Sequence, residues 1–299
     1  MMVLRVLSLF SGYGGGEFAL KRLGVDFVTV GFSDIKKHAI RCYEANHPGV
    51  KALGDVTKID ASSLEDFDLL FAGFPCQAFS MAGKRKGFDD TRGTLFRDII
   101  RIVEVKKPKF MLLENVAGLV SHDGGNTLSV ILREIRRVGY GVVYKVLNSK
   151  DYGVPQNRER IWLVCKLGGW DFMEFQFPEK RGLIKTLPML FDNSVNYKKV
   201  KKTPSRDVMR LKCANITNSD FSYCLCSKQD RYPNSGIIDF EDYYRFLTPR
   251  ECFRLMGFFD DEIDISMLSI IESYDLSGNG WDVNLASLIL KNMRGGEGF

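Results

Sequence analysis

Residues 3–23 read VLRVLSLFSGYGGGEFALKRL, and this stretch decides the fold. Its first part, 3–9, is a short apolar run that predicts a buried strand, and 17–23 continues as a helix. Glycines crowd the turn between them, where they let the backbone approach a ligand. Ligands of open parallel sheets bind beyond the carboxyl ends of the strands, and a helix amino terminus attracts a negative group. The stretch therefore predicts a strand, a ligand-binding turn and a helix, although a plain tight turn would look similar.

The same alternation continues to about residue 165. Apolar runs predict strands at 27–32, 67–72, 110–114, 142–147 and 161–165, and helical spacing predicts helices at 36–46 and 126–138. Strands and helices that alternate in this way predict an α/β fold with a doubly wound, mostly parallel sheet that is covered on both faces.

The pattern changes after residue 166, which indicates a second, smaller domain. Residues 167–244 are richer in Lys, Asn, Ser and Tyr, and their periodicity is weak. We expect residues 1–166 and 275–299 to form the main domain and residues 167–274 to form the smaller one.

Two helices are predicted near the carboxyl end. The first begins after Thr248 as its N-cap, with Pro249 at the first helical position and Glu251 at the third, and runs to Met256. The second is predicted at 283–293.

The composition is that of a soluble globular protein. Hydrophobic residues make up 45% and charged residues 26% of the 299 residues, and the net charge of +5 is compatible with a nucleic-acid partner without establishing one. No stretch approaches the roughly 20 apolar residues of a membrane helix, and the first apolar run is too short for a signal peptide. The seven cysteines have no regular spacing, which argues against a disulfide framework. We expect a cytoplasmic protein without a membrane partner, and a monomer as the default.

Two aspartates follow the early strands. Asp34 comes 22 residues after Gly12, at the end of the second strand, where a carboxylate can accept both hydroxyls of a ribose. Asp55 lies where a further strand is expected to end, and it can accept the exocyclic amine of an adenine. Each aspartate alone could equally be a turn residue or a helix cap. Together they predict a cofactor that contains adenosine, which is true of a methyl donor and of a nicotinamide cofactor.

Cys76 lies in the sequence AGFPCQAFS at 72–80, directly after a predicted strand. A lone cysteine is usually a buried structural residue. This one follows a proline and precedes a polar, glycine-rich loop. We therefore expect it to face the ligand site, where a thiolate can act as a nucleophile.

Glu114, Arg158 and Arg160 are candidate helpers of this nucleophile. Glu114 ends a strongly apolar run, and burial raises the pKa of a carboxyl group and favours a protonated general acid. A strand-terminal glutamate that faces water is the alternative. Arg158 and Arg160 alternate along an extended segment, so both can face one site, where guanidinium groups suit phosphate and carbonyl oxygens. An isolated pair of this kind would most often lie on the surface.

In this order, the motifs resemble those of the bacterial and phage DNA cytosine-5 methyltransferases. The similarity covers nearly the whole chain except 167–244. It rests on FSGYGG (10–15), PCQ (75–77), ENV (114–116), QxRxR (156–160) and RxLTPRECxRLMGF (245–258), followed by Gly278-Asn279. The resemblance implies a Rossmann-like methyltransferase sheet and a smaller target-recognition domain. It also implies S-adenosylmethionine as methyl donor, S-adenosylhomocysteine as product, and no metal.

The resemblance also implies a mechanism. Cys76 adds to carbon 6 of a cytosine that is flipped out of the DNA helix, and protonated Glu114 donates to ring nitrogen 3. Carbon 5 then takes the methyl group, a base removes the carbon-5 proton and Cys76 leaves. Arg160 is expected at the cytosine carbonyl, Arg158 at the phosphate backbone, and Asn115 as a brace for the loop of Cys76. The expected catalytic residues are Cys76, Gln77, Glu114, Asn115, Arg158 and Arg160.

By the same resemblance, residues at the strand ends hold the cofactor. Phe10 packs against the adenine and Asp34 binds the ribose, while Asn279 contacts the methionine end. The expected set is Phe10, Ser11, Gly12, Tyr13, Gly14, Gly15, Asp34, Ile35, Asp55, Val56, Gly73, Pro75, Leu95 and Asn279. The chain departs from the family where Gly280-Trp281 follows Gly-Asn in place of a small residue and a valine. Trp281 is expected either on the cofactor or in the core.

Double-stranded DNA is the expected partner. The basic segment 84–86 falls in the loop that would close over the flipped base, and its charges suit phosphates, although a solvated basic turn would read the same. The expected DNA contacts are Ser80, Lys84, Arg85, Lys86, Gln156, Lys198, Lys199, Lys201 and Lys202. Cys213, Cys224 and Cys226 lack the paired spacing of metal ligands, and we expect them to be small core residues.

Three alternatives remain open from the sequence. A related branch of the family methylates transfer RNA and typically carries PPCQPF, where this chain has FPCQAF at 74–79, and this difference favours DNA. A nicotinamide oxidoreductase has no use for Cys76 together with Glu114. A DNA-binding protein with an inactive site is disfavoured because every expected catalytic residue type is present. The expected setting is a restriction–modification system, phage self-protection or orphan methylation.

Overall fold

The computed structural model describes residues 3–75, 95–169, 175–192, 199–204, 206 and 210–297. The chain packs into two compact units. The first consists of Met1–Leu147, Arg160–Phe177 and Ile289–Phe299, and the second of Asn148–Glu159 and Pro178–Leu288. The predicted domains divide the chain by role, with cofactor binding at 1–166 plus 275–299 and DNA recognition at 167–274. That division stays a prediction.

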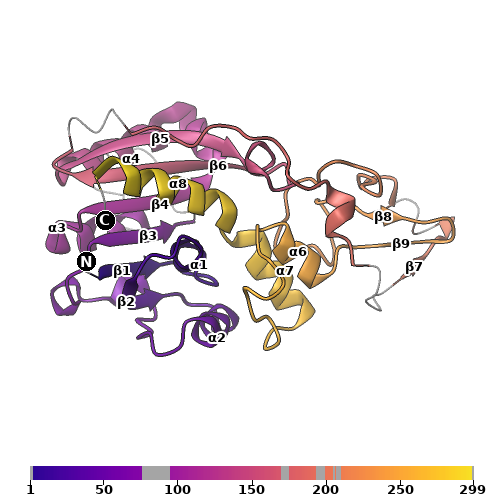
Figure 1. The fold of residues 1–299 in the computed structure, drawn as a ribbon, viewed down its shortest axis with the longest axis horizontal. Helices are drawn as coiled ribbons and strands as arrows, with labels where there is room; N and C mark the ends of the chain where they lie inside the picture. The colour runs from indigo at the N-terminus through magenta and orange to yellow at the C-terminus, as the bar shows by residue number, and fades with distance from the viewer. Residues whose placement is uncertain are drawn as a thin grey trace, which may run out of the picture. The chain divides into compact units, whose positions relative to one another are not determined.

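A six-stranded sheet forms the centre of the first unit (Figure 1). Its strands are β1 (Leu4–Leu9), β2 (Phe27–Ser33), β3 (Leu69–Gly73), β4 (Phe110–Val116), β5 (Tyr140–Asn148) and β6 (Glu159–Leu167). They lie in the order β2-β1-β3-β4-β6-β5; the pairs among the first four are parallel, and β6 runs antiparallel to β4. The predicted α/β fold with a mostly parallel sheet is therefore confirmed.

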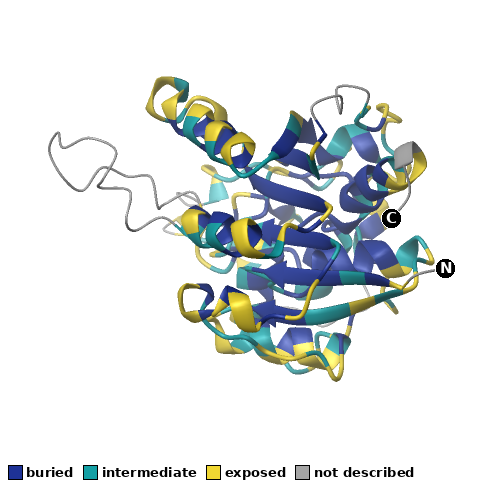
Figure 2. Cartoon of the chain, turned by 90° about the vertical axis from the view of Figure 1, so that its left-hand side faces the viewer, coloured by how far each residue is buried: buried dark blue, intermediate teal, exposed yellow. Residues whose placement is uncertain are grey.

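Helices flank this sheet, and its central strands are buried between them (Figure 2). They are α1 (Gly15–Arg22), α2 (Lys37–Asn46), α3 (Leu95–Lys106) and α4 (Asn126–Arg137). Helix α3 was not among the predicted elements, although Phe96, Ile99, Ile100 and Val103 are buried at the spacing that marks one helix face. The apolar residues of β3, β4, α3 and α4 form one core, which holds the carboxyl ends of the parallel strands in place.

The second unit contains a small sheet and helices. The strands β7 (Val200–Lys201), β8 (Ile238–Asp239) and β9 (Tyr243–Arg245) form antiparallel pairs in the order β7-β9-β8. The helices are α6 (Pro249–Arg254), α7 (Ile270–Asn279) and α8 (Val283–Glu297), of which α8 contributes its last residues to the first unit.

Thr248 begins α6 as predicted. Its Oγ1 accepts the amide of Glu251 at 3.2 Å, and Glu251 Oε2 accepts the amide of Thr248 at 2.8 Å, which is a complete capping box. The helix ends at Arg254, before the predicted Met256. The last amides bond three residues back, and Gly257 turns the chain at φ +84°.

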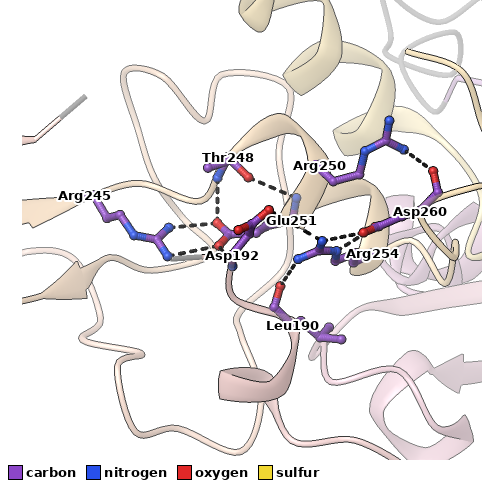
Figure 3. Close-up of polar contacts among 8 residues, drawn as sticks. All are labelled: Leu190, Asp192, Arg245, Thr248, Arg250, Glu251, Arg254 and Asp260. Carbon is purple, nitrogen blue, oxygen red and sulfur yellow. Dashed lines mark hydrogen bonds and ion pairs between the residues drawn. The ribbon is translucent and has the colours of Figure 1, made fainter. Parts of the chain in front are cut away.

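A buried ion pair joins α6 to β9 (Figure 3). Arg245 Nη1 and Nη2 lie 2.8 and 3.0 Å from the two carboxylate oxygens of Glu251, and the two side chains are 0% and 1% exposed. The same carboxylate accepts the amides of Asp192 and Thr248. The negative charge is therefore compensated from several sides.

We expect Arg245→Ala to destabilise the protein by about 3–5 kcal/mol, because it leaves the Glu251 carboxylate buried without its cation. Arg137→Ala is the matched control. Arg137 pairs with Glu104 at 2.8 Å, but the two side chains are 47% and 55% exposed, and such a pair contributes only about 0–1 kcal/mol. Urea unfolding compares the two variants, and an equal loss in both would contradict the assignment.

Candidate active site

The turn after β1, residues 10–16, is called the glycine turn here. Phe10, Gly12 and Gly14 have φ values of +55°, +56° and +83°. A Cβ on Gly14 would lie 2.4 Å from His47 Nε2, whereas a Cβ on Gly12 would meet no described atom within 4 Å. A positive φ at a residue other than glycine, as at Phe10, concentrates at ligand sites. One side of the turn is therefore packed against the protein, and the Gly12 side is open to a ligand.

Asp34 follows β2 and holds the glycine turn. Its Oδ2 accepts the amide of Gly12 at 3.0 Å, and its Oδ1 accepts the amide of Lys36 at 2.9 Å. The next residue, Ile35, is 74% exposed. An aspartate fixed beside an open glycine and an exposed apolar side chain can bind a polar group of a ligand next to an apolar one.

The sequence predicts that Asp55 lies at the end of a strand, but in the structure it does not. The chain before it makes only an isolated bridge between Phe32 and Ala52, and Asp55 instead caps a short 3-10 turn. Its Oδ1 accepts the amide and the hydroxyl of Thr57 at 3.0 and 2.8 Å. The Thr57 amide, together with that hydroxyl, lowers the pKa of Asp55, so the group is a carboxylate at neutral pH. Among the described residues, none forms a hydrogen bond with Asp55 Oδ2.

Glu114 and Arg160 meet at the carboxyl end of β4. Glu114 lies opposite Gly73 of β3, and Arg160 lies opposite Val116 at the start of β6. Arg160 Nε is 3.0 Å from Glu114 Oε1, and the two side chains are 16% and 9% exposed. The carboxyl group and the guanidinium therefore form a largely buried pair at this strand end.

Asn115 connects β4 to the segment that leads to Cys76. Its Nδ2 donates to the carbonyl of Phe74 at 2.8 Å, and both residues are buried. Pro75, the last described residue before Cys76, is exposed. This contact fixes the chain just after β3, and the role of Asn115 as a brace for the loop of Cys76 stays a prediction. Outside the described residues lie Cys76, Gln77, Ser80, Lys84, Arg85, Lys86 and Lys198.

Further residues of the expected cofactor set belong to the first unit. Val56 is buried behind Asp55, and Leu95 begins α3 and packs against the core. Tyr13 is buried, and Ser11 donates its amide to Ser33 at the end of β2 at 3.0 Å. Gly15 begins α1.

Arg158 and Gln156 differ from their expected places on a DNA-facing surface. Arg158 is 1% exposed, and its Nη2 donates to the carbonyls of Gly278 and Gly280 at 3.2 and 2.8 Å. Gln156 is fully buried and donates to the carbonyl of Leu255 at 2.6 Å. These groups already bond within the second unit, so their described contacts are structural.

Asn279 ends α7 in the second unit. Its Nδ2 donates to the carbonyl and to Oδ1 of Asp275 at 2.8 and 3.0 Å. A Cβ on the preceding Gly278 would lie 2.4 Å from the backbone of Cys226, which explains a glycine there. Trp281 is 8% exposed, so it fills interior space. The cofactor contact of Asn279 stays a prediction.

The predicted DNA-binding lysines fall into two groups. Lys199 and Lys201 are exposed, and Lys199 lies over the ring of Tyr243 at 4.7 Å. Lys202 instead pairs with Asp239 at 3.0 Å, and Arg210 pairs with the same carboxylate at 2.9 Å. The charge of Lys202 is thus already compensated within the second unit.

Cys213, Cys224 and Cys226 are half-buried rather than core residues. In the described ranges, no cluster of three or more His, Cys, Asp or Glu side chains could hold a metal. Within the same ranges, no helix is long and apolar enough to span a bilayer.

Sequence reasoning did not single out Glu17, Tyr43 and His47, which pack behind the glycine turn. The only signal was a glutamate in the first turn of a helix that opens with glycines. The partner residues come from another helix, which no local pattern reveals.

Comparison with known proteins identifies the family. A sequence model of the C-5 cytosine-specific DNA methylases matches residues 4–235. The type II methyltransferase M.NlaX of Neisseria lactamica is 37% identical over 98% of this chain and 96% of its own length. M.HhaI of Haemophilus parahaemolyticus, also a type II methyltransferase, is 37% identical over 97% of this chain and 94% of its own length. The chain therefore belongs to the family of C-5 cytosine-specific DNA methylases.

Other similarities are shorter or more distant. The orphan methyltransferase M.Rho11sI of Bacillus phage rho11s is 52% identical over an aligned part that covers 55% of this chain and only 33% of that protein. The solved structure of a Spodoptera frugiperda DNMT2 mutant has a TM-score of 0.80 at 22% identity and covers 97% of this chain and 99% of that one. At this identity the structural likeness shows the fold alone.

Proposed function

We propose that the chain transfers a methyl group from S-adenosylmethionine to carbon 5 of a cytosine in double-stranded DNA. The Glu114–Arg160 pair at the carboxyl end of β4 is the observation that carries the proposal. In the sequence, Cys76 comes three residues after the end of the neighbouring strand β3. A nucleophile, an acid and a guanidinium at adjacent strand ends are the groups that addition to a pyrimidine ring requires.

The donor set of the first unit fits S-adenosylmethionine. The open face of Gly12, the fixed carboxylate of Asp34 and the exposed Ile35 suit a ribose with an adenine beside it. Asp55 has a charged oxygen available for an amine. When bound there, the cofactor supplies an electrophilic methyl group.

Each catalytic side chain has one task in this proposal. The Cys76 thiolate forms a bond to carbon 6, the displaced electron pair of the ring moves to nitrogen 3, and nitrogen 3 takes a proton from Glu114 in its neutral acid form. The carboxylate that this leaves on Glu114 is stabilised by the Arg160 guanidinium. Arg160 orients Glu114 through its 3.0 Å contact, and its guanidinium would also bind the cytosine carbonyl. Once carbon 5 carries the methyl group that the cofactor would supply, a base removes the carbon-5 proton and the cysteine sulfur departs as its bond to carbon 6 breaks. Return of the nitrogen-3 proton to the Glu114 carboxylate then restores the neutral aromatic ring.

DNA is favoured over RNA as the substrate. The family matched is that of DNA methylases, and the relatives aligned along their whole length are type II methyltransferases. We therefore propose methylation within a restriction–modification system, or orphan methylation as the name of the phage relative states. The protein would act as a monomer in the cytoplasm.

Bisulfite sequencing of DNA from cells that express the chain tests the activity and reads the target sequence. Protected cytosines within one recurring sequence are expected. A duplex that contains 5-fluorocytosine at that site should trap a covalent adduct, since fluorine at carbon 5 cannot leave as a proton does. Methylation of transfer RNA in place of the duplex would overturn the proposal.

Asp55→Ala should weaken S-adenosylmethionine binding about tenfold, because a charge-assisted hydrogen bond to the adenine amine is lost. Asp60→Ala is a matched control, since Asp60 caps the next 3-10 turn through the same two contacts, to Ser62, at 2.9 and 2.7 Å. Calorimetric titration measures both. Equal weakening in the two variants would show that the loss is structural.

A further inference from the structure

His47, at the end of α2, holds the backbone of the glycine turn from behind. Its Nε2 lies 3.1 Å from the carbonyl of Tyr13, and His47 is 5% exposed. Because a carbonyl can only accept, Nε2 carries the proton and donates. The contact fixes the backbone at Tyr13, between Gly12 and Gly14. Gly12 faces open space, whereas a side chain at Gly14 would have no room beside His47.

Two aromatic neighbours fix the His47 ring, and a third ring fixes one of them. Phe18 of α1 meets it edge-on with centroids 4.7 Å apart, and Tyr43 lies 4.6 Å away. Tyr43 is itself stacked on Phe32 of β2 at 3.9 Å, and its hydroxyl donates to Glu17 Oε1 at 2.6 Å. The ring is thus anchored to α1, α2 and β2 at the same time.

Burial keeps His47 neutral, and a nearby positive charge adds to the effect. Burial, together with the nearby Lys21 ammonium, lowers the pKa of His47 to about 3. Burial also raises the pKa of Glu17 and of Tyr43. A neutral imidazole with a fixed tautomer is a constant donor to Tyr13 across the working pH range.

We infer that His47 is a positioning residue for the cofactor: it sets the conformation of the glycine turn through the Tyr13 carbonyl. The inference rests on the proposed cofactor, which would bind at the open side of that turn. Because His47 is buried and acts through the Tyr13 carbonyl, its effect should fall on cofactor affinity and not on the chemical step.

The test compares two replacements of His47 in the full-length protein. His47→Leu keeps apolar bulk but has no donor, and should raise the dissociation constant for S-adenosylmethionine about tenfold, or about 1.4 kcal/mol, with kcat at saturating cofactor unchanged. His47→Gln keeps an N–H donor and should restore most of the affinity. Tyr140→Phe is the control, because it removes a buried hydrogen bond of 2.6 Å to Pro108 in the same unit.

Amide hydrogen exchange gives a readout that does not need the cofactor. The amides of Gly12 and Gly14, which bond to Asp34 and to Ser11, should exchange faster in His47→Leu and not in Tyr140→Phe. Unchanged exchange, or equal affinities in the leucine and wild-type proteins, would overturn the inference. If the wild-type protein binds no S-adenosylmethionine but exchange is faster in His47→Leu, the proposed cofactor is overturned. The role of His47 in the turn then remains intact.

Discussion

Cys76→Ala should abolish methyl transfer, with a loss of about 10⁴-fold or more, while S-adenosylmethionine binding stays near the wild-type value. The reason is chemical: carbon 5 of cytosine is too weak a nucleophile to attack the methyl donor until sulfur has added to carbon 6. Losses of this size are typical when a covalent nucleophile is removed. Tritium transfer from labelled cofactor to duplex DNA measures the rate, and calorimetry measures binding.

Cys213→Ala serves as the control for this variant, since Cys213 is a half-buried cysteine of the second unit. It should retain activity and form the 5-fluorocytosine adduct. Normal methyl transfer by Cys76→Ala would remove the assigned nucleophile and with it the proposed mechanism.

Glu114→Gln should reduce kcat about 10²- to 10⁴-fold, the range for loss of a general acid. The amide fills nearly the same space, but it neither forms an ion pair with Arg160 nor supplies a proton to ring nitrogen 3. Single-turnover methylation measures the loss. Cofactor affinity should change little, because Glu114 lies near the end of β4, whereas Gly12 and Asp34, which fit the adenosine group, follow β1 and β2.

Glu104→Gln is the matched variant: Glu104 also pairs with an arginine, at 2.8 Å, but it is 55% exposed. It should leave the rate unchanged. A rate loss in Glu104→Gln as large as in Glu114→Gln would show that the effect comes from charge or folding and not from the site.

The sequence predicted the strand ends well because they depend on local patterns. β1 and β4 are apolar runs whose side chains are almost all buried, so periodicity alone locates them. The capping box at Thr248 is likewise local, since its partner Glu251 is three residues away. Helix α3 has an equally clear apolar face and was available to the same reasoning.

Long-range contacts explain what the sequence did not predict. Arg158 reads as one of an alternating pair, yet its carbonyl partner Gly278 is 120 residues away, and burial between them cannot be inferred from spacing. The brace of His47 on Tyr13 joins residues 34 positions apart. A strand was expected to end at Asp55, but the chain before it makes only the isolated bridge at Ala52 and turns at Gly54 with φ +71°.

β6 runs antiparallel to β4, and the register of this ladder determines which face of the sheet carries Arg160. The site is therefore sensitive to the position at which a residue is inserted. In the ladder with β4, Arg160 faces Val116 and Trp162 faces Glu114, so Arg160 and Glu114 are diagonal neighbours on one face. Slipping the ladder by a single position would send the guanidinium to the opposite face. One residue inserted between 161 and 164 should therefore separate the acid from its arginine, whereas the same insertion in the exposed segment at 180–184 should be tolerated.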